Sequence, residues 1–162
     1  MKIVKLGLFT ALALALSWIE SFIPFVQAAP GMKIGLANVV LLVLLELYGF
    51  KTALAVNVVR SLLSAALFGG AMSLPYSLFG GISAVFVMGL LRKIPGVTVT
   101  GAAVGGAFAH NAAQITVAFA VTQSPYVFTY LPVLGLLSVL TGMFTGICAR
   151  LCVEAFSRVA GR

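Results

Sequence analysis

The chain has 162 residues, of which 62% are hydrophobic and only 8% are charged. Soluble domains carry roughly 25% charged residues, so the composition excludes a water-soluble fold and leaves no room for a separate soluble catalytic domain. The net charge of +7 would suit nucleic acid, but the basic residues form no run or stripe, so we expect no nucleic-acid partner. We therefore predict one transmembrane domain over 1–162 with the lipid bilayer as its solvent.

Six apolar stretches follow one another along the chain, separated by proline and glycine. They cover residues 6–23, 34–50, 52–71, 74–91, 97–121 and 128–148. Each is long enough, or nearly so, to cross a hydrocarbon core of roughly 30 Å as a helix. They are too continuously apolar for the alternating strands of a membrane barrel. The pattern predicts an all-α polytopic membrane protein with a six-helix transmembrane bundle.

The first stretch has a second interpretation. Two lysines, an apolar run and the tripeptide Val26-Gln27-Ala28 are also typical of a secretory signal with a cleavage site. The run is long for such a signal, and Glu20 and Pro24 stand between it and the supposed cleavage site. We therefore favour a first spanning helix.

Lysine and arginine predict the orientation, because they gather in cytoplasmic loops. With the N-terminus inside, eight basic residues fall inside and Lys33 alone falls outside, while Arg60 lies within a span. The inside set is Lys2, Lys5, Lys51, Arg92, Lys93, Arg150, Arg158 and Arg162. This asymmetry predicts that both termini are cytoplasmic.

Small residues recur at helical spacing in three stretches. Helices associate in lipid where small side chains let their backbones approach. The rows are Gly101, Gly105, Ala109 and Ala113; Ala102, Gly106, His110 and Gln114; and, in the last stretch, Gly135, Gly142 and Gly146. We expect these to pack inside the bundle. The first stretch has Gly7, Ala11 and Ala15, which either pack against neighbouring helices or form a groove where another membrane subunit docks.

Polar residues within the apolar stretches are the candidate binding site, because such groups are costly in a membrane. Arg60 lies about nine residues from either end of its stretch, and His110, Asn111 and Gln114 share one helical turn. Candidates to complete a pocket toward the outer side are Lys33, Tyr76, Ser77 and Tyr130. The alternative is a purely structural network of hydrogen bonds between helices. We expect Glu20 to pair with Lys33, and Glu46 with Lys51.

Several kinds of catalytic chemistry are missing from the sequence. There is no aspartate, so the paired aspartates that hold magnesium diphosphate in typical chain-elongating prenyl synthases cannot be formed. There is no phosphate-binding P-loop, and one histidine with no C-x-x-C motif does not make a common zinc site. Cys148 and Cys152 are interpreted as small apolar residues. We predict a protein that is not an enzyme and has no cofactor or metal.

Several segments nevertheless resemble a known group. These are Pro30-Gly31-Met32-Lys33-Ile34-Gly35-Leu36-Ala37-Asn38, Arg60 with Leu67-Phe68-Gly69, Ser77-Leu78-Phe79-Gly80-Gly81, His110-Asn111-Ala112-Ala113-Gln114 and Tyr130-Leu131-Pro132. With them the chain resembles the Gx transporter family, also called heptaprenyl diphosphate synthase component I. It is also similar to the substrate-binding S components of energy-coupling factor transporters.

The resemblance implies a bacterial plasma-membrane protein that captures a small vitamin-like molecule. It also implies partners, namely a transmembrane coupling protein, which Ala11 and Ala15 would face, and two ATPase subunits. This is our leading hypothesis from the sequence. The alternatives are a non-catalytic membrane partner of a prenyl diphosphate synthase and a self-sufficient secondary transporter.

Overall fold

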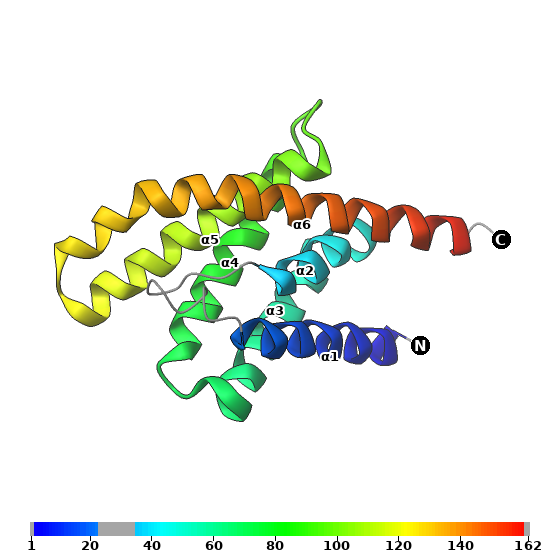
Figure 1. The fold of residues 1–162 in the computed structure, drawn as a ribbon. Coiled ribbons are helices and arrows are strands. Elements are labelled where there is room, and N and C mark those ends of the chain that lie inside the picture. Colours follow the sequence, from blue (N-terminus) through cyan, green and yellow to red (C-terminus); the bar gives the residue numbers. More distant parts are fainter. Residues whose placement is uncertain (1, 23–34, 161–162) are drawn as a thin grey trace.

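The computed structural model describes residues 2–22 and 35–160, and helices make up almost all of this part of the chain. In chain order they are α1 (Lys2–Ser21), α2 (Leu36–Tyr48), α3 (Phe50–Ser64), the π-helical turn η2 (Ala65–Gly69), α4 (Ser73–Leu91), α5 (Val99–Thr122), the 3₁₀ turn η3 (Pro125–Tyr130) and α6 (Leu131–Ala160). No strand occurs in these residues. The prediction of an all-α fold is confirmed (Figure 1).

Five of the helices are long and apolar enough to cross a membrane, which supports the predicted membrane protein. The sixth, α2, has 13 residues, and at 1.5 Å per residue it reaches only about 20 Å, short of a core of roughly 30 Å. The predicted count of six spanning helices is therefore not supported by the described residues. The last helix also continues twelve residues beyond the predicted end at 148, as far as Ala160.

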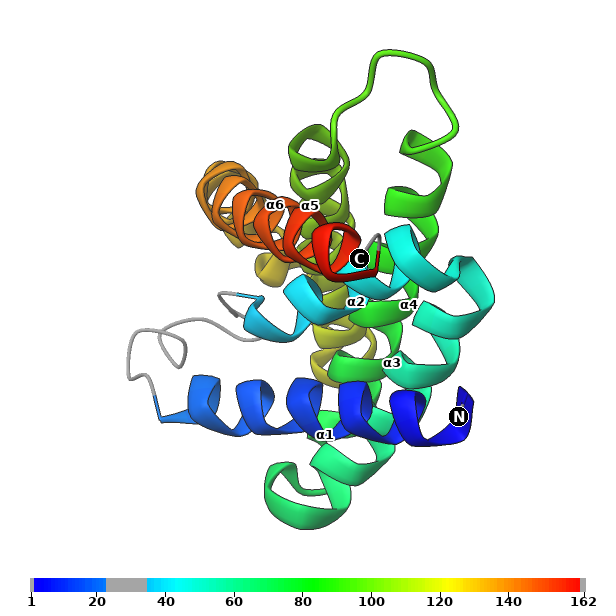
Figure 2. The same ribbon diagram turned by 90° about the vertical axis from the view of Figure 1, so that its right-hand side faces the viewer.

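The helices form two groups, which are joined through α2 and by the packing of α3 against α4. The most extensive pairings are those of α4 with α5 and of α5 with α6. On the other side, α1 packs against α2 and α3. The end-on view shows α2 between α1 and α6, with the two termini on the same side of the molecule (Figure 2). The short helix is therefore the centre of the fold.

The core follows from the sequence of α2, which is apolar on every side. Leu41, Leu42 and Leu44 are completely buried, as expected for a helix surrounded by other helices. Ala13 of α1 and Ala84 of α4 are buried in the same cluster. In contrast, many large apolar side chains on the other helices are exposed, which suits surfaces that face lipid.

Glycine allows the closest helix contacts. A Cβ added at Gly142 of α6 would overlap the Val104 backbone of α5, at 2.5 Å from its Cα. One added at Gly146 would lie 2.5 Å from the Cα of Thr100. The predicted packing role of the small residues at 142 and 146 is confirmed for this pair of helices.

Glu46 has a different partner from the one predicted. Its carboxylate accepts hydrogen bonds from Nε of Arg92 at 2.6 Å and from Nη2 at 3.1 Å, and the Arg92 Nη1 donates to the Val97 carbonyl at 2.6 Å. The prediction of a Glu46–Lys51 pair was wrong, because the planar guanidinium at the end of α4 offers two parallel donors. The hydrogen bond with Glu46 raises the pKa of Arg92 above its ordinary value.

We predict that Gly142→Ala destabilises the protein. The alanine gains about 1 kcal/mol of helix propensity, but the methyl group collides with the α5 backbone, and overpacking costs about 1–3 kcal/mol. Thermal unfolding in detergent should show a lower midpoint. Gly7→Ala is the matched control, because a Cβ at Gly7 meets nothing within 4 Å. Equal midpoints for the two variants would contradict the packing described here.

Candidate functional site

A buried arginine lies at the centre of the candidate site. Arg60 of α3 is 3% exposed. Its Nη1 donates to Ser17 Oγ of α1 at 2.9 Å, and its Nη2 donates to Asn57 Oδ1 at 2.8 Å and to Ser61 Oγ at 3.3 Å. The Ser61 hydroxyl in turn bonds that of Ser77 on α4 at 3.2 Å. Two helices therefore contribute hydroxyl or amide groups directly to one guanidinium, and α4 is linked to it through Ser61.

An acidic residue accompanies this arginine. Glu20, near the end of α1, is buried, and its Oε1 accepts a hydrogen bond from the backbone N–H of Gly35 at 2.7 Å. Its carboxylate attracts the Arg60 guanidinium electrostatically. The predicted partner of Glu20, Lys33, lies outside the described residues. Glu20 and Arg60 thus place one negative and one positive charge within the interior.

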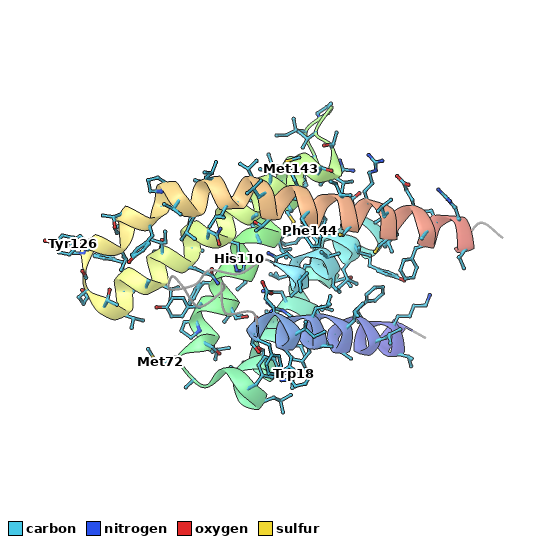
Figure 3. The ribbon with its side chains drawn as sticks, viewed as in Figure 1. Trp18, Met72, His110, Tyr126, Met143 and Phe144 are labelled. Carbon is cyan, nitrogen blue, oxygen red and sulfur yellow. The ribbon has the colours of Figure 1, made fainter. Side chains whose placement is uncertain are left out.

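Two consecutive glycines on α4 let the polar side chains approach. A Cβ at Gly81 would overlap the side-chain amide of Asn57, and one at Gly80 would lie 2.9–3.1 Å from the imidazole of His110. Any larger residue would push these side chains away from α4. The Gly80-Gly81 pair therefore connects the Arg60 cluster to His110 of α5, which lies in the interior of the molecule (Figure 3).

The polar interior continues from α5 to α6 through Asn111. Its Nδ2 donates to Ser138 Oγ at 2.8 Å and, more weakly, to the Leu134 carbonyl at 3.4 Å. A cavity of about 10 Å³ lies beside His110 and Asn111, and its other polar lining includes Asn38, Thr141 and Thr145. This volume holds about one water molecule. A larger molecule would enter only if the surrounding helices or side chains moved.

Several buried polar atoms have no hydrogen-bond partner among the described residues. They are Asn57 Nδ2, Arg60 Nε, and both Gln114 Nε2 and Gln114 Oε1. Gln114 and Asn57 are 0% exposed. An unsatisfied buried polar group costs about 1–3 kcal/mol, so these atoms lower stability unless something else binds them.

The structure brings together five of the eight predicted binding residues. Arg60, Ser77, His110, Asn111 and Gln114 are all buried in the polar interior. Tyr76 is partly buried on α4 beside Ser77. In contrast, Tyr130 is 46% exposed in η3, near the tip of the α5–α6 hairpin that Tyr126 marks in Figure 3. Lys33 lies outside the described residues.

Sequence reasoning missed several members of this interior. Asn57 could have been included from its spacing, because residues three positions apart on a helix are neighbours, and Ser61 is next to Arg60 in the sequence. Sequence spacing could not have identified Ser17 of α1 or Ser138 of α6. Each is an isolated serine in an apolar helix, and only tertiary packing places it beside a polar partner on another helix.

The small residues of α1 point outward. Gly7, Ala11 and Ala15 are all exposed, whereas Ala13 on the other face is fully buried. Of the two interpretations made from the sequence, packing of this row against neighbouring helices does not occur among the described residues. The row instead forms an exposed strip of small residues beside the exposed side chains of Leu8 and Leu12.

No group of three or more metal-ligating side chains occurs within residues 2–22 and 35–160. The same residues contain Cys148 and Cys152, whose thiols are not joined in a disulfide. The chemistry available in the interior is therefore that of hydrogen bonding and charge.

Comparison with known families confirms the first of the two resemblances seen in the sequence and does not confirm the similarity to S components of energy-coupling factor transporters. The family described as Heptaprenyl diphosphate synthase component I matches residues 9–152. The chain belongs to this family. No curated protein and no solved structure matches the chain. The match covers α1 through most of α6, so all the residues of the polar interior described above lie within it.

We predict opposite stability effects for two neighbouring amides. Gln114→Met removes an unpartnered buried amide while keeping its shape, and should raise the free energy of unfolding by about 1–3 kcal/mol. Asn111→Leu removes a donor that Ser138 uses, and should lower the free energy of unfolding by a similar amount. Denaturant or thermal unfolding measures both. A destabilised Gln114→Met variant would show that this amide is satisfied in the folded protein.

Proposed function

We propose that this protein is the substrate-capturing membrane component of a multi-subunit uptake system for a small molecule. The observation that carries the proposal is the polar interior, in which Arg60, Asn57 and Gln114 keep unused hydrogen-bonding atoms inside an apolar bundle. A protein usually departs from good packing rules at its functional sites. A bound molecule would satisfy these atoms and offset the cost of burying them.

The topology we propose has six crossings with both termini in the cytoplasm. The short helix α2 would be one of the six. The placement of both termini on the same side of the molecule supports an even number of crossings (Figure 1). The distribution of lysine and arginine then assigns that side to the cytoplasm, in a bacterial plasma membrane.

The energy for uptake would come from other chains. The sequence has no P-loop and very few acidic residues, which disfavours both self-contained ATP hydrolysis and a proton-driven carrier. We propose that Gly7, Ala11 and Ala15, which the bundle leaves exposed, contact a transmembrane coupling protein linked to ATPase subunits. Small side chains permit the close backbone approach that helix association in lipid requires.

The family description favours a second candidate, a membrane partner of a prenyl diphosphate synthase. In that assembly this chain would be the non-catalytic component, since the sequence lacks aspartate altogether. Its exposed apolar helices would then recruit the enzyme or its long apolar product to the membrane. The polar interior has no evident role in this second assembly, and for this reason we place it second.

Native mass spectrometry of the purified protein tests the proposal. We expect the wild-type chain to retain a small molecule, and Arg60→Gln and His110→Ala to lose at least tenfold in its occupancy while remaining folded by circular dichroism. The loss follows because each substitution removes a polar group that the interior brings together. If wild-type protein purified from cells that contain its natural nutrients retains no small molecule, the capture function is contradicted.

A second prediction concerns the partners. Ala11→Trp should retain the small molecule as the wild type does but fail to co-purify with a coupling protein, because the indole would project from the strip of small residues on α1 and prevent the close approach of another helix. Leu136→Trp is the matched control, since Leu136 is exposed on α6, far from α1 in sequence. Co-purification of the wild type with a prenyl synthase, and with no coupling protein, would support the second candidate instead.

A further inference from the structure

We infer that the captured molecule presents a single carboxylate to the interior between α3, α4 and α5. This inference rests on the proposed capture function and names the chemical class of the substrate. It comes from two properties of the interior, the kind of hydrogen-bonding atoms left unused and the amount of charge that is buried.

The unused hydrogen-bonding atoms are mainly donors. Arg60 Nε carries one N–H, and the side-chain nitrogens of Asn57 and Gln114 carry two each. Against these five N–H groups there is one unused acceptor, Gln114 Oε1. The Asn57 amide has a fixed orientation, because its oxygen already accepts from Arg60. A molecule that fits here must therefore be rich in acceptors, and a carboxylate offers about four acceptor positions on two oxygens.

These donors lie at one level of the bundle. α4 and α5 run antiparallel, since Gly105 and Gly106 meet Leu91 and Met88 while His110 meets Gly80. One turn further along α5 is Gln114, and the same step along α4 leads to Ser77. Ser77 bonds Ser61, the neighbour of Arg60. Gln114 therefore lies at about the level of the bundle where the arginine cluster contacts α4.

The charge balance selects a carboxylate over a phosphate. Arg60 is the one cationic side chain in the described interior, and the Glu20 carboxylate already attracts it. A phosphate ester carries a charge of about −1.5 to −2, so most of that charge would stay uncompensated in a medium where buried charge is very costly. A carboxylate adds only one negative charge beside Glu20, a smaller excess than a phosphate brings, and its two oxygens suit the planar donors of a guanidinium.

Formate is a suitable probe, because it is the smallest carboxylate and needs little space. We expect sodium formate to raise the unfolding temperature of the purified wild-type protein saturably, by several degrees more than sodium chloride at equal ionic strength. The Arg60→Gln variant should lose this response. The Arg150→Gln variant should keep it, since Arg150 is exposed and pairs with Glu154 on α6. Gln114→Met, which removes two of the five donors without removing the charge, should need a several-fold higher formate concentration.

Three results would overturn the inference. These are equal responses to formate and chloride in the wild type, an unchanged formate response in Arg60→Gln, and a larger response to sodium phosphate than to formate. Chemical identification of the retained molecule separates this inference from the proposed function. A retained molecule without a carboxyl group would refute the carboxylate and leave capture standing. A formate response in a protein that retains nothing from cells would refute capture and leave the anion site standing.

Discussion

Burying the Arg60 guanidinium within an apolar helical bundle imposes a constraint on the rest of the interior. A charge taken out of water costs several kcal/mol unless it is hydrogen-bonded and balanced. The fold meets this demand by bringing Ser17 from α1 and Asn57 and Ser61 from α3 to the guanidinium, with Ser77 of α4 bonded to Ser61. The Glu20 carboxylate is close enough to attract it. The packing of α1 and α4 on α3 is thus tied to the solvation of one side chain.

Glycine makes this arrangement sterically possible. Gly80 and Gly81 leave room on α4 for His110 and Asn57, so that polar groups from α3 and α5 reach the same helix. Gly142 and Gly146 have the corresponding role between α5 and α6, where an added Cβ would lie closest to backbone atoms. Close helix approach and a polar interior therefore have a common origin in small residues on facing helices. In lipid, where apolar burial contributes little to helix association, such contacts are a main source of stability.

The interior and the outer face suggest different tasks. Inside, donors outnumber acceptors, which favours a bound molecule with oxygen acceptors. Outside, α1 presents a row of small residues that the bundle does not use. The family name refers to prenyl diphosphate synthesis, while the aspartates on which typical synthases depend are missing. In the function that we propose, a binding component that works with other chains accounts for both the interior and the outer face.

The sequence by itself determined the helical class, the membrane environment and the identity of several interior polar residues. These follow from apolar length and from the high cost of polar groups in lipid, both of which are local properties. Arg60, His110 and Gln114 could be selected for that reason. Only the tertiary structure decided that α2 is a short central helix, that Glu46 pairs with Arg92 rather than Lys51, that Tyr130 lies outside the polar interior, and that the row on α1 faces outward. The sequence also could not identify Ser17 and Ser138, the partners of Arg60 and Asn111 on other helices. Each of these depends on which helix faces meet, and helical periodicity specifies a face of one helix without specifying the helix that covers it.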